Sequence, residues 1–374
     1  MPGKIRVGIV GATVTKGGSG WGANAHVPAL RALPDYELKA VCTAHADTAR
    51  ASAEAFGAEQ SFDNFEAMVA NPDIDLVVVC VRVPGHHALV MQALEAGKNV
   101  FCEWPLGANL AEAQEMARLA NASSLRTAVG LQAQSDQSLL YVRELIRDGY
   151  VGEVLAVNYV SISQAVTERG AGRIWQGDRR NGANTLTIAA GHAIDALCFI
   201  LGELEEVSAR LAVNLDQWHN PETGETMKVD SPDWISVSGR LVGGGQVAFL
   251  VTTVPANPSG TRFEIFGREG TLVLSANALN QGATRIVGSR GKDPLEPMDP
   301  PSRFRLVPAE TPSGAPFNVA QAYVRYAASA SQGQVYQPNF DHAVKRHALI
   351  EAIERADAEA RAVRVDSILS SVTA

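Results

Sequence analysis

The stretch Asn99-Val100-Phe101-Cys102-Glu103-Trp104-Pro105-Leu106-Gly107 decides how the rest of the chain is interpreted. An apolar run follows Gly97-Lys98 and stops at a proline, which cannot continue the hydrogen-bond ladder of a central strand. In α/β proteins, ligands bind in the crevice at the carboxyl ends of such strands. We therefore expect a carboxylate, an indole and a proline to line a functional crevice after this strand.

Around this stretch, apolar strands alternate with amphipathic helices through the first third of the chain. We predict strands at 5–10, 36–42, 76–81, 100–102 and 127–131, and helices at 25–33, 47–56, 62–69, 87–96 and 110–120. Strands without polar alternation, separated by helices, are typical of a parallel sheet covered on both faces. The pattern predicts an α/β Rossmann domain, a doubly wound dinucleotide-binding fold, over residues 1–131.

The second part of the chain, residues 132–374, shows a different pattern. We predict strands at 154–160, 207–215, 234–241, 246–254, 262–266 and 271–274, and helices at 187–201 and 340–362. The turn Val242-Gly243-Gly244-Gly245 predicts a hairpin, and residues 217–233 and 288–318 are interpreted as loops. We expect an α+β domain with a large, mainly antiparallel sheet, whose C-terminal helix could pack back on the first domain.

Composition limits the classes of partner. The chain has 374 residues, 46% of them hydrophobic and 19% charged, and a net charge of −8 with mixed signs. This distribution predicts no nucleic-acid and no membrane partner and favours a small-molecule substrate. The short polar start and the absence of a membrane-length apolar run in the sequence lead us to expect a cytoplasmic protein. The histidines never combine with carboxylates or cysteines at ligand spacing, so we expect no metal.

The first turn contains an incomplete glycine fingerprint. Gly8 and Gly11 follow the first strand and could let a dinucleotide pyrophosphate approach the backbone. The third glycine of a G-x-G-x-x-G pattern does not follow at the usual spacing, and a loop from 12 to 22 intervenes. Thr13, Thr15 and Lys16 of this loop are candidate phosphate ligands. A merely flexible insertion is the alternative.

The end of the second predicted strand bears on the choice of nicotinamide cofactor. An acidic residue there would hold the ribose 2′-hydroxyl of NAD and repel the 2′-phosphate of NADP. The chain instead has Thr43 and His45, and no carboxylate before Asp47. The cofactor is therefore predicted as NAD(P) with a weak preference for NADP, which no arginine reinforces.

Four motifs together resemble one family. They are Gly8-x-x-Gly11, the stretch 97–106, Gly191-His192-x-x-Asp195 and the run 263–272. The combination is similar to the Gfo/Idh/MocA (glucose-fructose oxidoreductase / inositol dehydrogenase) family, and the E-W-P triplet resembles its branch containing the yeast galactose-pathway repressor. The resemblance implies an NAD(P)-dependent oxidoreductase for a sugar, cyclitol or related hydroxy or carbonyl compound. It also implies a homodimer or homotetramer formed through the sheet of the second domain.

The same resemblance leaves the activity open. The branch includes a binding protein, so a non-catalytic dinucleotide-binding sensor is the main alternative, and a net non-redox reaction with retained cofactor is a third. The family's usual E-K-P lysine is replaced by Trp104, whose indole cannot accept a proton. His192 then becomes the expected proton carrier, with Asp195 orienting its ring and Trp104 positioning substrate.

Further site residues are expected at the strand ends and before the helix of His192. Pro84, His87, Glu103, Trp104 and Pro105 are expected beside the cofactor, with helix capping as the alternative for His87. The Trp104–Pro105 bond is a candidate cis peptide. Arg179, next to Arg180, could equally belong to a solvated pair. The expected substrate-binding residues are Gln132, Gln134, Trp175, Arg179, Asn184 and His192.

Overall fold

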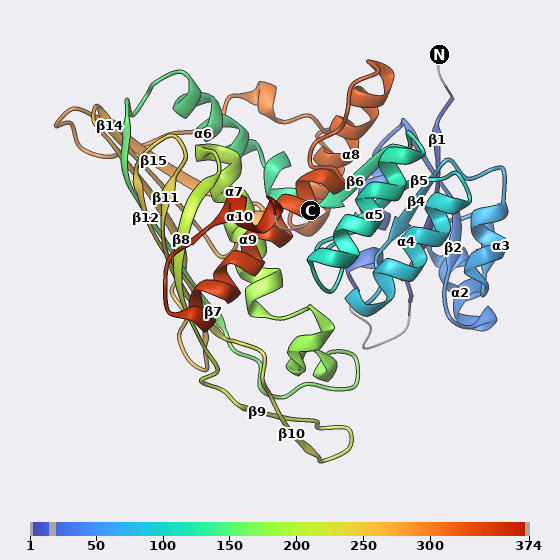
Figure 1. Cartoon of the computed structure of the whole chain (residues 1–374). Helices are drawn as coiled ribbons and strands as arrows, with labels where there is room; N and C mark the ends of the chain where they lie inside the picture. Colours follow the sequence, from blue (N-terminus) through green and yellow to red (C-terminus); the bar gives the residue numbers. More distant parts are fainter. Residues whose placement is uncertain (1–2, 15–19, 371–374) are drawn as a thin grey trace. The chain divides into compact units, whose positions relative to one another are not determined.

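The structure is a computed structural model that describes residues 3–14 and 20–370 (Figure 1). The chain divides into two compact units. The first comprises residues up to 132 together with 306–344, and the second comprises 133–305 together with 345–374. The sequence assigned everything after residue 131 to the second domain, whereas 306–344 pack within the first unit.

The first unit contains a fully parallel sheet with the strand order β3-β2-β1-β4-β5-β6. Its strands are β1 (Ile5–Val10), β2 (Tyr36–Cys42), β3 (Gln60–Phe62), β4 (Leu76–Val79), β5 (Asn99–Glu103) and β6 (Thr127–Gly130). The helices between them are α1 (Val27–Ala32), α2 (Ala46–Phe56), α3 (Phe65–Ala70), α4 (His86–Glu95) and α5 (Leu110–Ala122). The order reverses between β1 and β4, which is where a doubly wound sheet opens a ligand crevice. The predicted Rossmann fold is confirmed.

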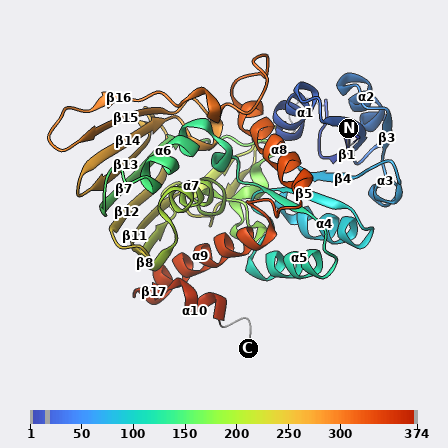
Figure 2. The same cartoon turned by 90° about the horizontal axis from the view of Figure 1, so that it is seen from above.

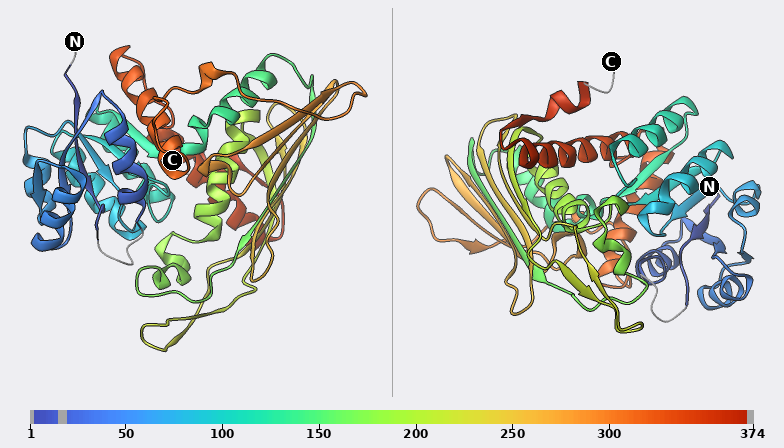
Figure 3. Two further views of the ribbon diagram at one scale, coloured as in Figure 1. Left: turned by 180° about the vertical axis from the view of Figure 1, so that it is seen from behind. Right: turned by 60° about the horizontal axis from the view of Figure 1, so that its bottom comes forward.

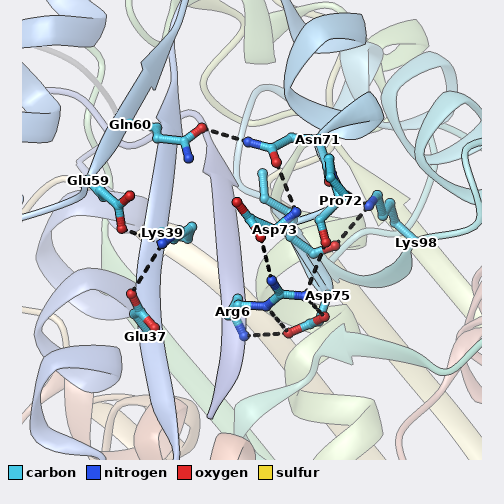
Figure 4. Close-up of polar contacts among 11 residues, drawn as sticks. Arg6, Glu37, Lys39, Glu59, Gln60, Asn71, Pro72, Asp73, Asp75 and Lys98 are labelled. Carbon is cyan, nitrogen blue, oxygen red and sulfur yellow. Dashed lines mark hydrogen bonds and ion pairs between the residues drawn. The ribbon is translucent and has the colours of Figure 1, made fainter. Parts of the chain in front are cut away.

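Charged and polar side chains tie together the amino-terminal end of this sheet (Figure 4). The guanidinium of Arg6, at the start of β1, donates to both carboxylate oxygens of Asp75 at 3.0 and 2.8 Å. Lys98, just before β5, donates to the carbonyl oxygens of Asn71 and Ile74 at 2.7 and 2.9 Å. These contacts fix the loops at one end of the strands and leave the opposite, carboxyl end for ligands.

Helix α8 (Ala315–Ser331) was not predicted from the sequence. It packs against α1 and against the π-helical turn Gly22–His26 within the first unit. Its polar residues Asn318 and Gln321 are fully buried, and the carboxamide of Gln321 accepts a hydrogen bond from the backbone of Leu306. Because buried polar residues interrupt the apolar face, the helical period does not stand out in the sequence.

The second unit is built on one large sheet with the order β16-β15-β14-β13-β7-β12-β11-β8-β17, in which only β7 and β12 pair in parallel (Figure 2). The strands are β7 (Val154–Gln164), β8 (Leu204–Ala212), β11 (Trp234–Leu241), β12 (Gln246–Val254), β13 (Gly260–Gly267), β14 (Gly270–Ala276), β15 (Arg285–Arg290), β16 (Glu296–Pro297) and β17 (Val363–Arg364). The helices are α6 (Gln137–Arg147), α7 (Gly191–Leu201), α9 (Phe340–Glu359, which begins in the first unit) and α10 (Val365–Ser370). The mainly antiparallel sheet was predicted correctly.

Helices α6 and α7 lie on one face of this sheet (Figure 2). In both views of Figure 3 the opposite face carries no helix of the described residues. A shallow hollow on the sheet is lined by Ala156, Asn158, Ser208, Ser238 and Ala248 among others. A subunit contact through this sheet stays a prediction.

The two segments interpreted as loops contain short elements. Residues 217–233 include the hairpin strands β9 (Gln217–His219) and β10 (Thr226–Lys228), which pair antiparallel. Residues 288–318 include the end of β15, all of β16 and the first turn of α8. Strands of two or three residues are too short to show a hydrophobic period, so the loop interpretation was wrong for these positions.

The apolar helix before and through His192 consists of two parts. A π-helical turn, Thr185–Ala190, runs directly into α7. The helical stretch Arg179–Leu201 is apolar and long enough to span a membrane by composition, which the sequence analysis did not expect. Since 61% of its most apolar window is buried inside the protein, the stretch has the character of a core helix.

The buried His347 of α9 gives the first prediction. Burial lowers its pKa to about 3, whereas an unfolded chain would have a pKa near 6.5. Below pH 6.5 the unfolded chain binds a proton that the folded chain does not, so this residue lowers stability as the pH falls. Between pH 7.5 and 5.0 the linkage is about 2 kcal/mol.

We expect the free energy of unfolding of the wild type to fall by about 2 kcal/mol more than that of His347→Leu over this pH range. Urea denaturation followed by tryptophan fluorescence at both pH values measures the difference. Parallel pH dependence in the two proteins would contradict a neutral, buried His347.

Candidate functional site

A cavity of about 510 Å³ opens at the carboxyl ends of the parallel strands in the first unit. Residues following β1, β2, β3 and β4 all contribute to it. Its lining is Val10, Gly11, Thr13, Cys42, Thr43, Ala44, His45, Thr48, Asp63, Phe65 and Val81. The position beside the first glycine turn is the one at which Rossmann domains bind the adenosine half of a dinucleotide.

Gly11 has a backbone conformation and close surroundings that favour glycine. Its φ is +96°, and a Cβ at this position would lie 2.5 Å from the carbonyl oxygen of Cys80. At Gly8 a Cβ would lie 2.9 Å from Cδ1 of Ile74. A side chain at Gly11 would collide with the backbone, whereas one at Gly8 would press on flexible side chains. The backbone at Gly11 is therefore bare where a pyrophosphate would approach, and the site fits the cofactor that the sequence predicts.

The third glycine of the fingerprint is present, but displaced along the chain. Gly22 begins the π-helical turn Gly22–His26, and a Cβ there would lie 3.1 Å from Cα of Ala12. The close approach of helix and strand that the third glycine normally permits is therefore made by Gly22. Sequence analysis missed it because the intervening loop changes the spacing.

Of the three predicted phosphate ligands, the structure describes only Thr13. Thr13 lines the cavity. Thr15 and Lys16 lie outside the described residues. The backbone N–H of Val14 donates to Oγ of Ser52 at 3.2 Å, which fastens the start of the loop to α2.

The far wall of the cavity combines hydroxyls with a carboxylate. Oγ1 of Thr43 lies 2.6 Å from Oγ1 of Thr48 and donates to the carbonyl oxygen of His45 at 3.0 Å, so both threonines organise the turn before α2. Asp63, directly after β3, also lines the cavity. Burial, aided by the negative charge of Asp63, raises the pKa of Cys42 to about 11. Asp63 brings to the cavity the acidic group that the end of β2 lacks.

Glu103 of the E-W-P triplet is held by the protein itself. Its carboxylate lies 2.8 Å from Nε2 of His26 and accepts from Nε2 of Gln132 at 3.0 and 3.2 Å. Nδ1 of His26 lies 2.7 Å from the hydroxyl of Tyr323. A Cβ on Gly130 would lie 2.3 Å from Oε1 of Glu103, so the carboxylate rests directly on the backbone of β6. These contacts give Glu103 and Gln132 a supporting role.

The two histidines after β4 differ in burial and in their contacts, and the expected position of His87 beside the cofactor stays a prediction. Oε2 of Glu115 lies 2.9 Å from Nε2 of His87, which is partly exposed between α4 and α5. The buried member is His86, whose ring lies between the carbonyl oxygens of Pro105 and Val81 at 2.9 and 3.0 Å. Burial lowers the pKa of His86. His86 links the strand β4 to the E-W-P loop, a function that the sequence analysis did not assign to it.

The E-W-P loop keeps the predicted backbone. The Trp104–Pro105 peptide bond is cis, as expected, and Pro84 lies in the short 3₁₀ turn Val83–Gly85 before α4. Trp104 is 5% exposed. Its assignment to the nicotinamide side stays a prediction.

In the second unit, His192 follows a capped helix start. Oδ1 of Asn184 accepts from the backbone of Leu186 and Thr187 at 3.0 and 3.2 Å, and Oγ1 of Thr187 accepts from the backbone of Asn184 at 2.9 Å. This capping box starts the π-helical turn. His192 is partly exposed at the second position of α7. π-helical turns are frequent at functional sites.

Asp195 belongs to a buried polar cluster. Its carboxylate accepts from Nε2 of Gln134 at 3.0 and 3.1 Å, and Oδ1 lies 3.9 Å from Nε of Arg346. Arg346 is 1% exposed and also pairs with Glu203. Gln134 and Asp195 were both predicted as site residues, and the structure joins them. Arg346, which is 151 positions after Asp195 in the numbering, was not identified from the sequence.

The remaining predicted residues make contacts within the second unit. Nε1 of Trp175 donates to the carbonyl oxygen of Gly172 at 2.8 Å. Nη2 of Arg179 pairs with Oε1 of Glu354 at 2.9 Å, and both side chains are largely exposed. Arg179 thus forms an ion pair with a residue of α9, and its role in substrate binding stays a prediction.

Comparison with known proteins places these features in a family. Residues 5–131 match the family model of the oxidoreductase family with an NAD-binding Rossmann fold, and residues 138–276 match that of the Gal80p C-terminal domain. The dehydrogenase aclE of Aspergillus oryzae is 33% identical over 293 residues, which cover 75% of this chain and 79% of that protein. The galactose/lactose metabolism regulatory protein GAL80 of Saccharomyces cerevisiae is 26% identical, over 79% of this chain and 74% of that protein.

Solved structures agree on the fold. A super-repressor mutant of Gal80p from Saccharomyces cerevisiae superimposes with a TM-score of 0.85 at 21% identity, covering 98% of this chain and 99% of that one. Levoglucosan dehydrogenase in complex with NADH and levoglucosan has a TM-score of 0.83 at 19% identity, covering 96% and 99%. With its glycine cradle, its E-W-P loop and these similarities, the chain belongs to the Gfo/Idh/MocA family of oxidoreductases with an NAD-binding Rossmann fold, in the branch that resembles Gal80.

Proposed function

We propose that this protein is an NAD-dependent oxidoreductase that moves a hydride between nicotinamide and a sugar, a cyclitol or a related hydroxy or carbonyl compound. The observation that carries the proposal is the cavity at the carboxyl ends of β1 to β4, floored by the bare backbone of Gly11. A bare backbone beside a cavity at the strand ends suits a dinucleotide pyrophosphate and its adenosine. The dehydrogenase relatives support a redox role.

The reaction needs a group on the protein that moves the hydroxyl proton of the substrate. When bound, the nicotinamide supplies the hydride acceptor or donor. Trp104 stands where the family usually has lysine, and its indole can donate one hydrogen bond but cannot accept a proton. We propose His192 as the proton carrier, because an imidazole titrates near neutral pH, and Asp195 with Arg346 as the buried cluster that fixes α7 beside it.

The second candidate function is a non-catalytic regulator that binds the dinucleotide. Two observations favour it: Trp104 replaces the usual lysine, and residues 138–276 match the Gal80p C-terminal domain. One assay separates the two. Purified protein is incubated with NAD, then NADP, against sugars, polyols and their carbonyl counterparts, and the absorbance of the reduced cofactor is followed. Turnover supports the enzyme; dinucleotide binding without turnover across the panel supports the regulator.

Gly11→Ala should weaken the binding of the cofactor. The added Cβ meets the Cys80 carbonyl oxygen at 2.5 Å and the backbone at φ +96° disfavours any side chain. We expect the Kd for NADH, measured by fluorescence titration, to rise at least about tenfold, or about 1.4 kcal/mol. Gly57→Ala is the matched control, because Gly57 also has a positive φ of +72° but has nothing within 4 Å of an added Cβ. Equal effects of both variants on NADH affinity would contradict the cradle.

The carboxylate of Asp63 should make the protein prefer NAD to NADP, which revises the weak preference for NADP drawn from the end of β2. We expect the wild type to bind NADH at least about tenfold more tightly than NADPH, because a carboxylate in the cavity repels the 2′-phosphate. Asp63→Asn should reduce this ratio, whereas Asp47→Asn should not, since Asp47 is 90% exposed and pairs with Arg50. A ratio unchanged by Asp63→Asn would remove this residue from cofactor selection.

His192→Ala should lower kcat while leaving cofactor binding intact. Loss of a general acid or base costs about 10² to 10⁴ in rate. The control is His342→Ala, which removes a histidine from the start of α9. Steady-state kinetics with the best substrate of the panel give kcat, and NADH titration gives Kd. A His192→Ala enzyme with wild-type kcat would show that another group moves the proton.

A further inference from the structure

The second unit contains a cavity of about 190 Å³ that the proposed chemistry does not use. It lies between the turn that carries Arg169 and Arg173, the hairpin strand β9 with Trp218, and the start of the π-helical turn at Asn184. Ile188, four residues before His192, also lines it. Two arginines therefore reach one small hollow beside the segment that leads to α7.

Arg169 is pre-positioned in this cavity. Its guanidinium carbon lies 3.9 Å from the centre of the Trp218 ring. Nε donates to the carbonyl oxygen of Val166 at 2.8 Å, and Nη1 donates to the carboxamide oxygen of Gln176 at 2.7 Å. Nη2 has no hydrogen-bond partner among the described residues. Burial, followed by the positive charge of Arg173, lowers the pKa of Arg169 to about 10.

The charge of the cavity is not neutralised by the part of the chain that the structure describes. Neither Arg169 nor Arg173 has a carboxylate within ion-pair distance among those residues, and Arg173 is exposed with no side-chain hydrogen bond there. The carboxylate that lines the cavity is Asp233, which is 8% exposed. Its two oxygens accept backbone N–H groups of Asn214 and Leu215 at 2.8 and 2.7 Å. Two cations thus face one carboxylate that is already engaged by the backbone.

We propose that this cavity binds the carboxylate of a small hydroxylated organic acid. A guanidinium with free N–H groups matches a carboxylate in geometry as well as in charge, and an anion relieves the repulsion between the two arginines. A volume of about 190 Å³ limits the ligand to a small molecule. Trp218 and Ile188 offer apolar contact, and the carboxamide of Asn184 offers polar contact, so a compact, hydroxyl-bearing skeleton fits better than a long chain.

The acid has two possible sources: the substrate itself, in which case the inference rests on the proposed function, or a separate ligand that binds without being converted. Both share the same contact with Arg169 and Arg173. Binding is therefore measured directly on the full chain, without turnover, and the source is assigned afterwards from kinetics.

The experiment compares D-glucuronate with D-glucose, which share a skeleton and differ in the carboxylate. Both are titrated into the protein at constant ionic strength and followed by saturation-transfer difference NMR. We expect glucuronate to bind at least about tenfold more tightly than glucose. Arg169→Gln should weaken glucuronate binding about tenfold or more, as expected for hydrogen bonds to charged groups. Arg180→Gln is the matched control, because Arg180 is 85% exposed and pairs with Asp178.

Arg173→Gln tests whether weaker glucuronate binding in Arg169→Gln results only from a disturbed structure. This side chain makes no hydrogen bond or ion pair with the described residues, so its loss should leave Tm unchanged while weakening glucuronate at least about threefold, less than for Arg169 because the site is more exposed. Equal binding of glucuronate and glucose, or wild-type glucuronate affinity in both Arg169→Gln and Arg173→Gln, would overturn the proposal.

Kinetics then show whether the acid is the substrate or a separate ligand. They also test the oxidoreductase proposal independently of the acid-binding cavity. If the acid is the substrate, kcat/KM prefers the acidic member of each sugar pair and Arg173→Gln removes that preference. If the acid is a separate ligand, glucuronate binds in the same assay without turnover. Absence of turnover with every sugar, polyol and carbonyl compound of the panel, together with intact, arginine-dependent glucuronate binding, would refute the oxidoreductase proposal alone.

Discussion

The first unit depends on the hydrogen bonds that the carboxylate of Glu103 makes inside it. This carboxylate joins the helical turn after the glycine loop, through His26, to the end of β6, through Gln132, and it rests against the backbone of Gly130. Through His26 it also reaches Tyr323 of α8. A carboxylate with 12% of its side chain exposed is stable only when such donors satisfy it. The loop, the strand and α8 must therefore all be in place together.

This arrangement explains how the residue after Glu103 can change without loss of the fold. The position of the E-W-P loop depends on Glu103 and on the contact between His86 and the carbonyl oxygen of Pro105. Neither contact uses the side chain at position 104. A lysine or a tryptophan can occupy that position on the same scaffold, so one fold accommodates both a catalytic site and a binding site that performs no chemistry. The architecture is therefore compatible with both functions, and the oxidoreductase proposal rests on side chains, above all on the proposed role of His192.

Sequence analysis predicted most elements that have a clear period, with the amphipathic helix α6 as an exception, and it missed features whose signal is not local. The strands β1, β2, β4, β5 and β6 are apolar runs, whereas the three-residue β3, which contains Gln60 and Ser61, was not predicted. The hairpin at Gly244 has the glycines that its positive φ requires. Sequence analysis missed Gly22 because a long loop separates it from Gly8 and Gly11. It missed Asp63 because this carboxylate follows β3 and not β2, where an acidic residue was sought. His86 and His87 are adjacent in the chain, and only the packing decides which of them is buried. Helix α8 was hidden by its buried polar residues.

The charged residues that line the two cavities also could not be identified from the sequence, although they bear on the proposed ligands. The chain as a whole carries −8, which would disfavour anions if charge acted at long range. At physiological ionic strength, however, the screening length is about 8 Å, so a ligand responds to the groups that line its cavity. Asp63 faces the first cavity, and Arg169 with Arg173 faces the second. Arg169 and Trp218 are 49 positions apart in the sequence and meet only because the β9–β10 hairpin folds over the turn. Net charge therefore says little about what these two cavities bind, and both proposed ligand preferences rest on residues that the fold brings together.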